Sequence, residues 1–201
     1  TKTFSEAAYE SEIRWKHLLR VRSKRNPNTF ETFEVADGIF QLREGFVIHW
    51  YRSSEKMKRD SYERDQKIAS AMEKLQSLKD QKRRGPKTEL TLARQVENIL
   101  THYGAQDWIV AKIETELREN FTKATRGKPS KDSVYKRTIK KLPKLSLRIN
   151  AEGVSRSKAI DGIFPLTTNT QLGSVDVLKH YKYQPKLEKR FSFLKSNLSI
   201  S

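Results

Sequence analysis

The middle of this chain spaces its apolar residues as a helix does, whereas the segments around it do not. From Ser54 onward, apolar residues fall at three- and four-residue steps, and charged residues fill the positions between them. The apolar members are Met57, Ile68, Ala71, Met72, Leu75 and Leu78. This period predicts a long amphipathic helix. The helix should end at about Lys82, because Gly85 and Pro86 follow directly.

Segments on both sides of this helix have the composition of strands. Residues 30–51 are rich in aromatic and β-branched side chains, and Asp-Gly and Glu-Gly pairs interrupt them. They predict two or three short antiparallel strands joined by tight turns. Residues 145–150 alternate apolar and polar side chains, and we expect them to form a hairpin with residues 159–169.

The remaining segments complete an α+β pattern. Residues 5–22 fit a helix or, in their second half, a strand. We expect helices over 88–102 and 106–123, a loop or short exposed helix over 122–144, and a last helix that begins at Ser174 and ends near Lys195. The chain then has three parts: a strand-rich segment (1–52), a helical, basic insertion (53–144) and a C-terminal part (145–201).

The net charge of the chain indicates which classes of partner it could bind. Lysine and arginine number 41 against 24 aspartates and glutamates, which gives a formal net charge of +17. Such an excess favours polyanions, of which nucleic acid is the commonest. No apolar run approaches the ~20 residues that a membrane-spanning helix needs, so we expect no membrane span. The lack of cysteine excludes disulfide scaffolds, thiolate zinc sites and cysteine nucleophiles, and it fits a cytoplasmic protein.

Four polar residues share one face of the predicted last helix. An arc of about 60° holds Tyr181, Gln184, Glu188 and Lys195, because each residue turns the helix by ~100°. The neighbouring apolar strip consists of Leu187, Phe191, Leu194 and Leu198. We expect this strip to pack on a strand over residues 160–166 and to leave Glu188 exposed. On spacing alone, the simpler interpretation is a surface helix with solvated charges.

The segment that carries these residues resembles a transposase signature. Residues 181–195 are similar to the Y-x2-R-x3-E-x6-K signature of insertion-sequence transposases of the IS-four type, and more closely of the IS-sixteen-thirty-four branch. Residues 161–169 resemble the strand that precedes the signature. Residues 48–53, with the charged helix that bears Asp60 and Arg64, resemble the start of the family's inserted segment. The resemblance covers about 46–196 and is loose in the middle.

This resemblance implies a fold, a reaction and partners. The fold would be a ribonuclease H-like core interrupted by a largely helical insertion. The reaction would be DNA transposition by a DDE-type enzyme, with Mg²⁺ supporting phosphoryl transfer at the transposon ends. The partners would be DNA and a second copy of the enzyme. The enzyme would lie in the cytoplasm of a bacterial or archaeal cell, at the nucleoid when bound to DNA.

The resemblance also assigns roles to single residues. Glu188 matches the last catalytic acid, which is a metal ligand in the family. Tyr181 and Lys195 match the tyrosine and lysine that contact DNA phosphate. Gln184 replaces the signature arginine. This replacement removes a bidentate phosphate contact, so we expect weaker DNA binding there.

Two basic runs are further candidates for DNA contact. The first contains Lys82, Arg83 and Arg84, and it either grips phosphates or forms a solvated loop between helices. The second extends from Arg126 to Lys144 and includes Tyr135. It either contacts DNA or is disordered.

The other two acids of the family have no match in this sequence. Both precede the inserted segment in the family, whereas no aspartate here comes before Asp37. We therefore expect the C-terminal part of a transposase, cut at both ends and inactive alone, because one carboxylate cannot hold two ions ~3.5–4 Å apart. Asp161 is either a second acid or part of a turn, and its Asp-Gly sequence favours the turn. The competing classes are a non-catalytic, basic DNA-binding module and a helical interaction module built on residues 54–82.

Overall fold

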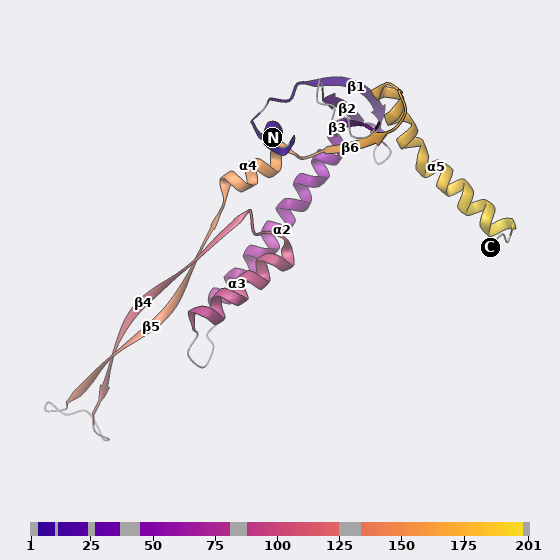
Figure 1. Cartoon of the computed structure of the whole chain (residues 1–201). Helices are drawn as coiled ribbons and strands as arrows, with labels where there is room; N and C mark the ends of the chain where they lie inside the picture. Colours follow the sequence, from indigo (N-terminus) through magenta and orange to yellow (C-terminus); the bar gives the residue numbers. More distant parts are fainter. Residues whose placement is uncertain are drawn as a thin grey trace. The chain divides into compact units, whose positions relative to one another are not determined.

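The chain forms two compact units of mixed α and β structure (Figure 1). The computed structural model describes residues 4–10, 12–23, 27–36, 45–80, 88–124 and 134–198, with only the backbone of Lys123 and of 194–198. One unit comprises residues 1–62 and 155–201, and the other comprises residues 63–154. The helices are α1 (Phe4–Tyr9), α2 (Ser54–Asp80), α3 (Glu89–Tyr103), α4 (Ala151–Ala159) and α5 (Ser174–Leu198). The strands are β1 (Trp15–Arg22), β2 (Phe30–Ala36), β3 (Val47–Ser53), β4 (Ile109–Lys123), β5 (Tyr135–Ile149) and β6 (Ile163–Thr168).

The first unit is built on a four-stranded antiparallel sheet in the order β1-β2-β3-β6. The antiparallel strands expected within residues 30–51 are confirmed as β2 and β3. Residues 5–22, for which a helix and a strand were both considered, contain a short helix, α1, followed by strand β1. The hairpin expected between residues 145–150 and 159–169 is wrong. Residues 151–159 form α4 instead of a turn, and β6 pairs with β3.

Side chains alternate between the two faces of this sheet, as strand geometry requires. One face buries Phe33, Val35 and Tyr51 under Leu178 of α5. On the other face, the ring of Phe4 stacks on Trp50 with a centroid distance of 3.9 Å. Helices α1 and α5 therefore pack on opposite faces of the sheet.

A tight turn leads into β6. Gly162 has a φ of +78°, which residues with a side chain rarely adopt. Its N–H donates to Oδ2 of Asp60 (2.9 Å), and its carbonyl accepts from the N–H of Ser53 (3.0 Å). Asp161 lies next to it in the turn and is only 7% exposed. The interpretation of Asp161-Gly162 as a turn before a strand is thus confirmed.

The second unit packs helices against the base of a two-stranded ribbon. Its core contains Ala71, Leu75 and Leu78 of α2, Leu92 and Val96 of α3, and Ala105, Ile109 and Leu145 near and on the strands. The helices expected from Ser54 and over 88–102 are confirmed as α2 and α3. Thr88 caps α3 by accepting a hydrogen bond from the N–H of Thr91 (3.2 Å).

The ribbon itself differs from the sequence expectation. The helix expected over 106–123 is wrong, because residues 109–123 form β4 and pair with β5 along their whole length. The loop or short exposed helix expected over 122–144 is also wrong for residues 135–144, which belong to β5. Pro143 is tolerated in β5 because a two-stranded ribbon leaves one edge of each strand unpaired. No helix in the described part of the chain is long and apolar enough to cross a membrane.

Candidate nucleic-acid interface

Helix α5 is anchored to the sheet by its first turns (Figure 1). Val177 and Leu178 are 8% and 0% exposed, and the ring of Tyr181 lies 6.1 Å from that of Phe164 on β6. Lys182 adds a cation–π contact, with its Nζ 3.9 Å from the centroid of Phe33. These contacts hold the start of α5 against β2 and β6.

Two buried polar side chains of β3 fix the first residue of α5. The hydroxyl of Tyr51 donates to the carbonyl of Ser174 (2.9 Å), and Nδ1 of His49 is 3.2 Å from Oγ of Ser174. Burial raises the pKa of Tyr51 to about 12 and lowers the pKa of His49 below its usual 6.5. Both groups are therefore neutral at pH 7, and their role here is to position α5.

Beyond these turns α5 is exposed, which corrects one expectation. Leu187 is 41% exposed and Phe191 is 63% exposed, so they do not pack on residues 160–166. The side chains of Leu194 and Leu198 lie outside the described part. The docking residues come earlier: Leu187 lies nine residues after Leu178, about 13 Å further along the helix axis. Pro185 lies between the docked and exposed parts and has no N–H for the carbonyl of Tyr181.

The polar face predicted for α5 is present over the described side chains. Tyr181 is 49% exposed, and Gln184 and Glu188 are exposed one and two turns later. Nε2 of Gln184 donates to Oε1 of Glu188 (3.2 Å). Within the described residues, Glu188 accepts no other hydrogen bond and forms no ion pair. The expectation of an exposed Glu188 is confirmed.

Several predicted site residues fall where no side chain is described. The backbone of Lys195 belongs to α5, and its side chain lies outside the described part of the chain. Lys82, Arg83 and Arg84 lie outside the described residues altogether. The structure therefore brings together Tyr181, Gln184 and Glu188 of the predicted set.

A hollow of about 310 Å³ lies beside Tyr181 in the first unit. Its charged and hydroxyl-bearing lining residues are Glu31, Ser53, Glu55, Lys56, Arg59, Tyr181 and Lys182. Glu31 accepts hydrogen bonds from Oγ of Ser53 (2.7 Å) and Nζ of Lys182 (2.9 Å). The sequence analysis missed this cluster because β2, β3, α2 and α5 bring its members together from distant parts of the chain.

The acids of the described residues do not fit a two-metal site. Such a site needs several carboxylates around two ions. No group of three or more histidine, aspartate or glutamate side chains among the described residues could hold a metal ion. Glu188 has an amide neighbour, and Asp161 is buried in its turn. The Mg²⁺ site that the resemblance implies is not formed by these residues.

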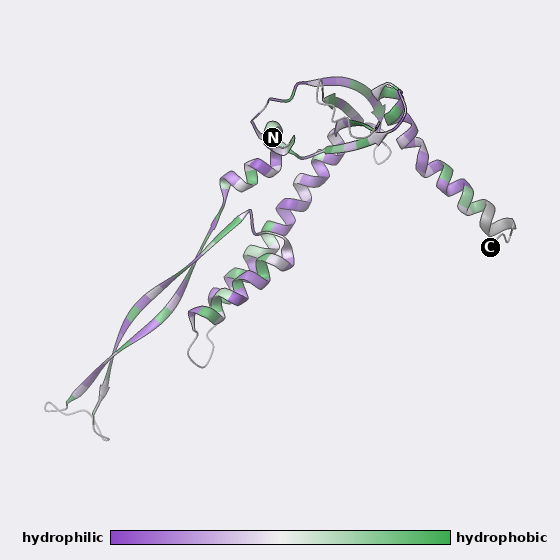
Figure 2. Cartoon of the chain, in the orientation of Figure 1, coloured by the Kyte–Doolittle hydropathy of each residue, from purple (hydrophilic) through white to green (hydrophobic). Residues whose placement is uncertain are grey.

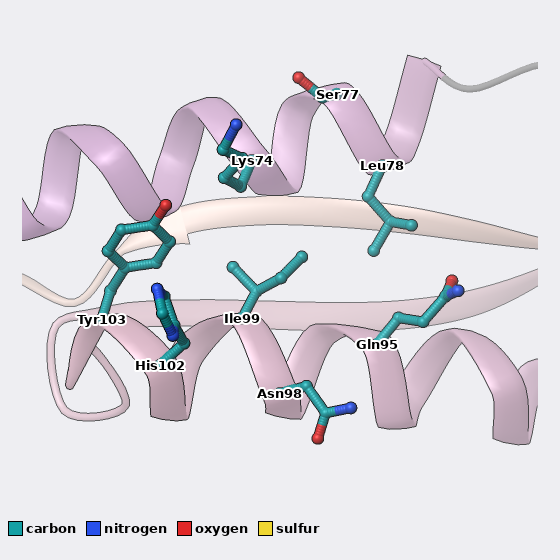
Figure 3. A pocket seen from close by; sticks show the side chains of 8 residues that line it. All are labelled: Lys74, Ser77, Leu78, Gln95, Asn98, Ile99, His102 and Tyr103. Carbon is teal, nitrogen blue, oxygen red and sulfur yellow. The ribbon is translucent and has the colours of Figure 1, made fainter.

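A second hollow, of about 540 Å³, lies in the other unit between α2 and α3 (Figure 3). Leu78 and Ile99 point into the space between the two helices, while Lys74 and Asn98 lie at its rim. None of the residues that the sequence assigned to catalysis, DNA contact or metal binding lines it, although its α2 residues belong to the segment 54–82 considered as an interaction module. Comparison of the chain with protein families, with curated proteins and with solved structures finds no match.

Proposed function

We propose that this chain is the DNA-contacting, C-terminal part of a DDE transposase of the IS-four type. The observation that carries the proposal is the face of α5, where Tyr181, Gln184 and Glu188 are aligned and exposed, with Tyr181 beside Phe164 of β6. The net charge of +17 supports DNA as the partner of the chain.

In this proposal the residues of α5 hold DNA rather than complete the reaction. The phenol of Tyr181 would donate a hydrogen bond to a phosphate oxygen of the DNA backbone. Glu188 would contribute one carboxylate to an active site whose other acids are not among the described residues. The transposition reaction is therefore assigned to a complete enzyme and not to this set of residues.

We expect the isolated chain to bind duplex DNA without nicking it. The reason is that only one of the family's three catalytic acids has a match in this chain, namely Glu188. Incubation with supercoiled plasmid and Mg²⁺ or Mn²⁺ should leave the plasmid intact, while a gel-shift assay shows binding. The Glu188→Gln variant should bind equally well or slightly more tightly, because it removes a negative charge. Metal-dependent nicking that disappears in Glu188→Gln would contradict this expectation.

A DNA-binding module without catalysis is the second candidate. The absence of a three-ligand cluster within the described ranges favours it. The structure gives less support to a helical interaction module, because Ala71, Leu75 and Leu78 of α2 are already buried within the chain's own core. A partner helix would have to bind another face of α2.

A further inference from the structure

The positive charge of the second unit gathers on one strand of its ribbon. All charged residues of β5 are basic: Lys136, Arg137, Lys140, Lys141, Lys144 and Arg148. Basic and acidic residues nearly balance in α2, in α3 and in β4. A uniformly basic strand within otherwise balanced surroundings is typical of a surface that binds a polyanion.

The pairing register separates the ribbon into two unlike faces. In Figure 2, hydrophilic and hydrophobic stretches follow one another along β4 and β5. The face that bears Ile109 carries mostly apolar residues, and its base packs against α2 and α3 through Ile109, Ala111, Ile113, Leu145 and Leu147. The opposite face carries Lys112, Glu114, Glu116, Arg118, Lys136, Lys140, Lys144 and Arg148. Since the apolar face packs on the helices, the polar face points away from them.

Most cations of the polar face have no carboxylate partner. Lys144 approaches Glu116 at 3.9 Å, but within the described chain no ion pair involves Lys112, Arg118, Lys136, Lys140 or Arg148. All of these side chains are exposed. They are free to contact an anion without first breaking an internal ion pair.

One pair of cations faces each other directly. Arg118 and Lys140 are opposite partners in the ribbon. Like charges in this position destabilise a strand pair. An anion bound between them would relieve the repulsion, so this pair points to a ligand rather than to a purely structural role.

We propose that the polar face of β4–β5 is a binding surface for the phosphates of duplex DNA. The major groove of B-DNA is ~12 Å wide and admits a two-stranded ribbon, whereas the major groove of duplex RNA is too narrow. A ribbon with strands of this length extends about 50 Å, or ~15 base pairs. This inference goes beyond the proposed function, because it needs neither Glu188 nor transposition.

Two adjacent lysines allow a sharp test. Lys140 lies on the polar face and Lys141 on the apolar face, and both are exposed. Binding to a DNA duplex of about 30 base pairs is measured by fluorescence anisotropy across a salt series. Lys140→Gln should lower the slope of log K against log salt by about 0.9, and Lys141→Gln should leave it unchanged. Equal effects of the two substitutions would overturn the proposal.

A matched set of variants separates this surface from net charge. Lys112→Gln/Lys136→Gln/Lys140→Gln and Lys67→Gln/Lys74→Gln/Lys79→Gln each remove three exposed lysines, from the ribbon and from α2. The ribbon variant should lose about 2.7 in slope and bind more than tenfold more weakly at low salt, while the α2 variant keeps the parental slope. A duplex RNA of the same sequence should show no ribbon-dependent loss. Equal losses in the two variants, or an equal loss with RNA, would overturn the proposal. Because α5 is intact in all of them, these outcomes do not depend on Glu188.

Discussion

Leu178→Ala is expected to lower the free energy of unfolding of the first unit by about 2–5 kcal/mol, because it removes a fully buried side chain at the contact between α5 and the sheet. Phe191→Ala, although it removes a larger side chain from the same helix, should cost less than about 0.5 kcal/mol because its ring is 63% exposed. The pair of substitutions thus measures where α5 is held.

The measurement uses the tryptophans of the first unit. In a Trp108→Phe background only Trp15 and Trp50 remain, and both lie in that unit. Urea unfolding followed by their fluorescence then gives the stability of each variant relative to the background. A large loss in Phe191→Ala with little loss in Leu178→Ala would show that α5 docks through its second half instead.

Gly153→Ala is expected to destabilise the second unit by about 2–3 kcal/mol, through overpacking against backbone. A Cβ at this position would lie 1.9 Å from the carbonyl oxygen of Asp107 and 2.9 Å from Nδ2 of Asn150. That amide donates to the same carbonyl of Asp107 (2.9 Å), so the methyl group would also break the contact that ties the start of α4 to the chain before β4. Thermal unfolding followed by circular dichroism gives the change.

The sign of this effect is informative, because alanine is ordinarily the better helix former by about 1 kcal/mol. Ser155→Ala, at an exposed position of the same helix, provides the control and should be neutral or slightly stabilising. A stabilising Gly153→Ala would mean that α4 does not approach Asp107 as closely as described.

Elements with a clear period could be predicted from the sequence. The three- and four-residue spacing of apolar residues from Ser54 predicted α2. Helix α3 has the N-cap residue Thr88 before it and Gly104, in the left-handed conformation, after it. The aromatic and β-branched run gave β2 and β3. In each case local propensity and burial favour the same structure, so no information from distant residues was needed.

Long-range pairing explains the elements that were missed. Residues 106–123 contain many good helix formers, but Ile109, Ala111 and Ile113 also alternate at period two, and pairing with β5 decides between the two forms. Residues 135–144 were predicted to form an exposed loop or short helix because their strand structure depends on pairing with β4, which their own composition does not show. Residues 151–159 form α4 instead of the expected turn. Strand β6 therefore forms no hairpin with residues 145–149, and it pairs with β3.

The candidate site was predictable only where it lies on one helix. Tyr181, Gln184 and Glu188 share a face because helical geometry fixes it, and their exposure follows from the polar neighbours. The hollow beside Tyr181 and the opposed pair Arg118 and Lys140 require tertiary pairing. The prediction that the apolar strip of α5 packs on residues 160–166 was wrong for a related reason. Amphipathic spacing shows which face of a helix could pack on a sheet, but it does not show how far along the helix the sheet extends.

The exposed face of α5 that bears Glu188 is expected to lie against bound DNA. The chain has no cysteine, so Glu188→Cys creates a single attachment point for an iron chelate that generates hydroxyl radicals. Ser5→Cys on α1, which packs on the opposite face of the sheet, is the matched control. With duplex DNA bound at low salt, the chelate at position 188 should cut the DNA backbone, and the chelate at position 5 should give only the background of free chelate. Background cleavage from position 188, with binding intact, would contradict the claim.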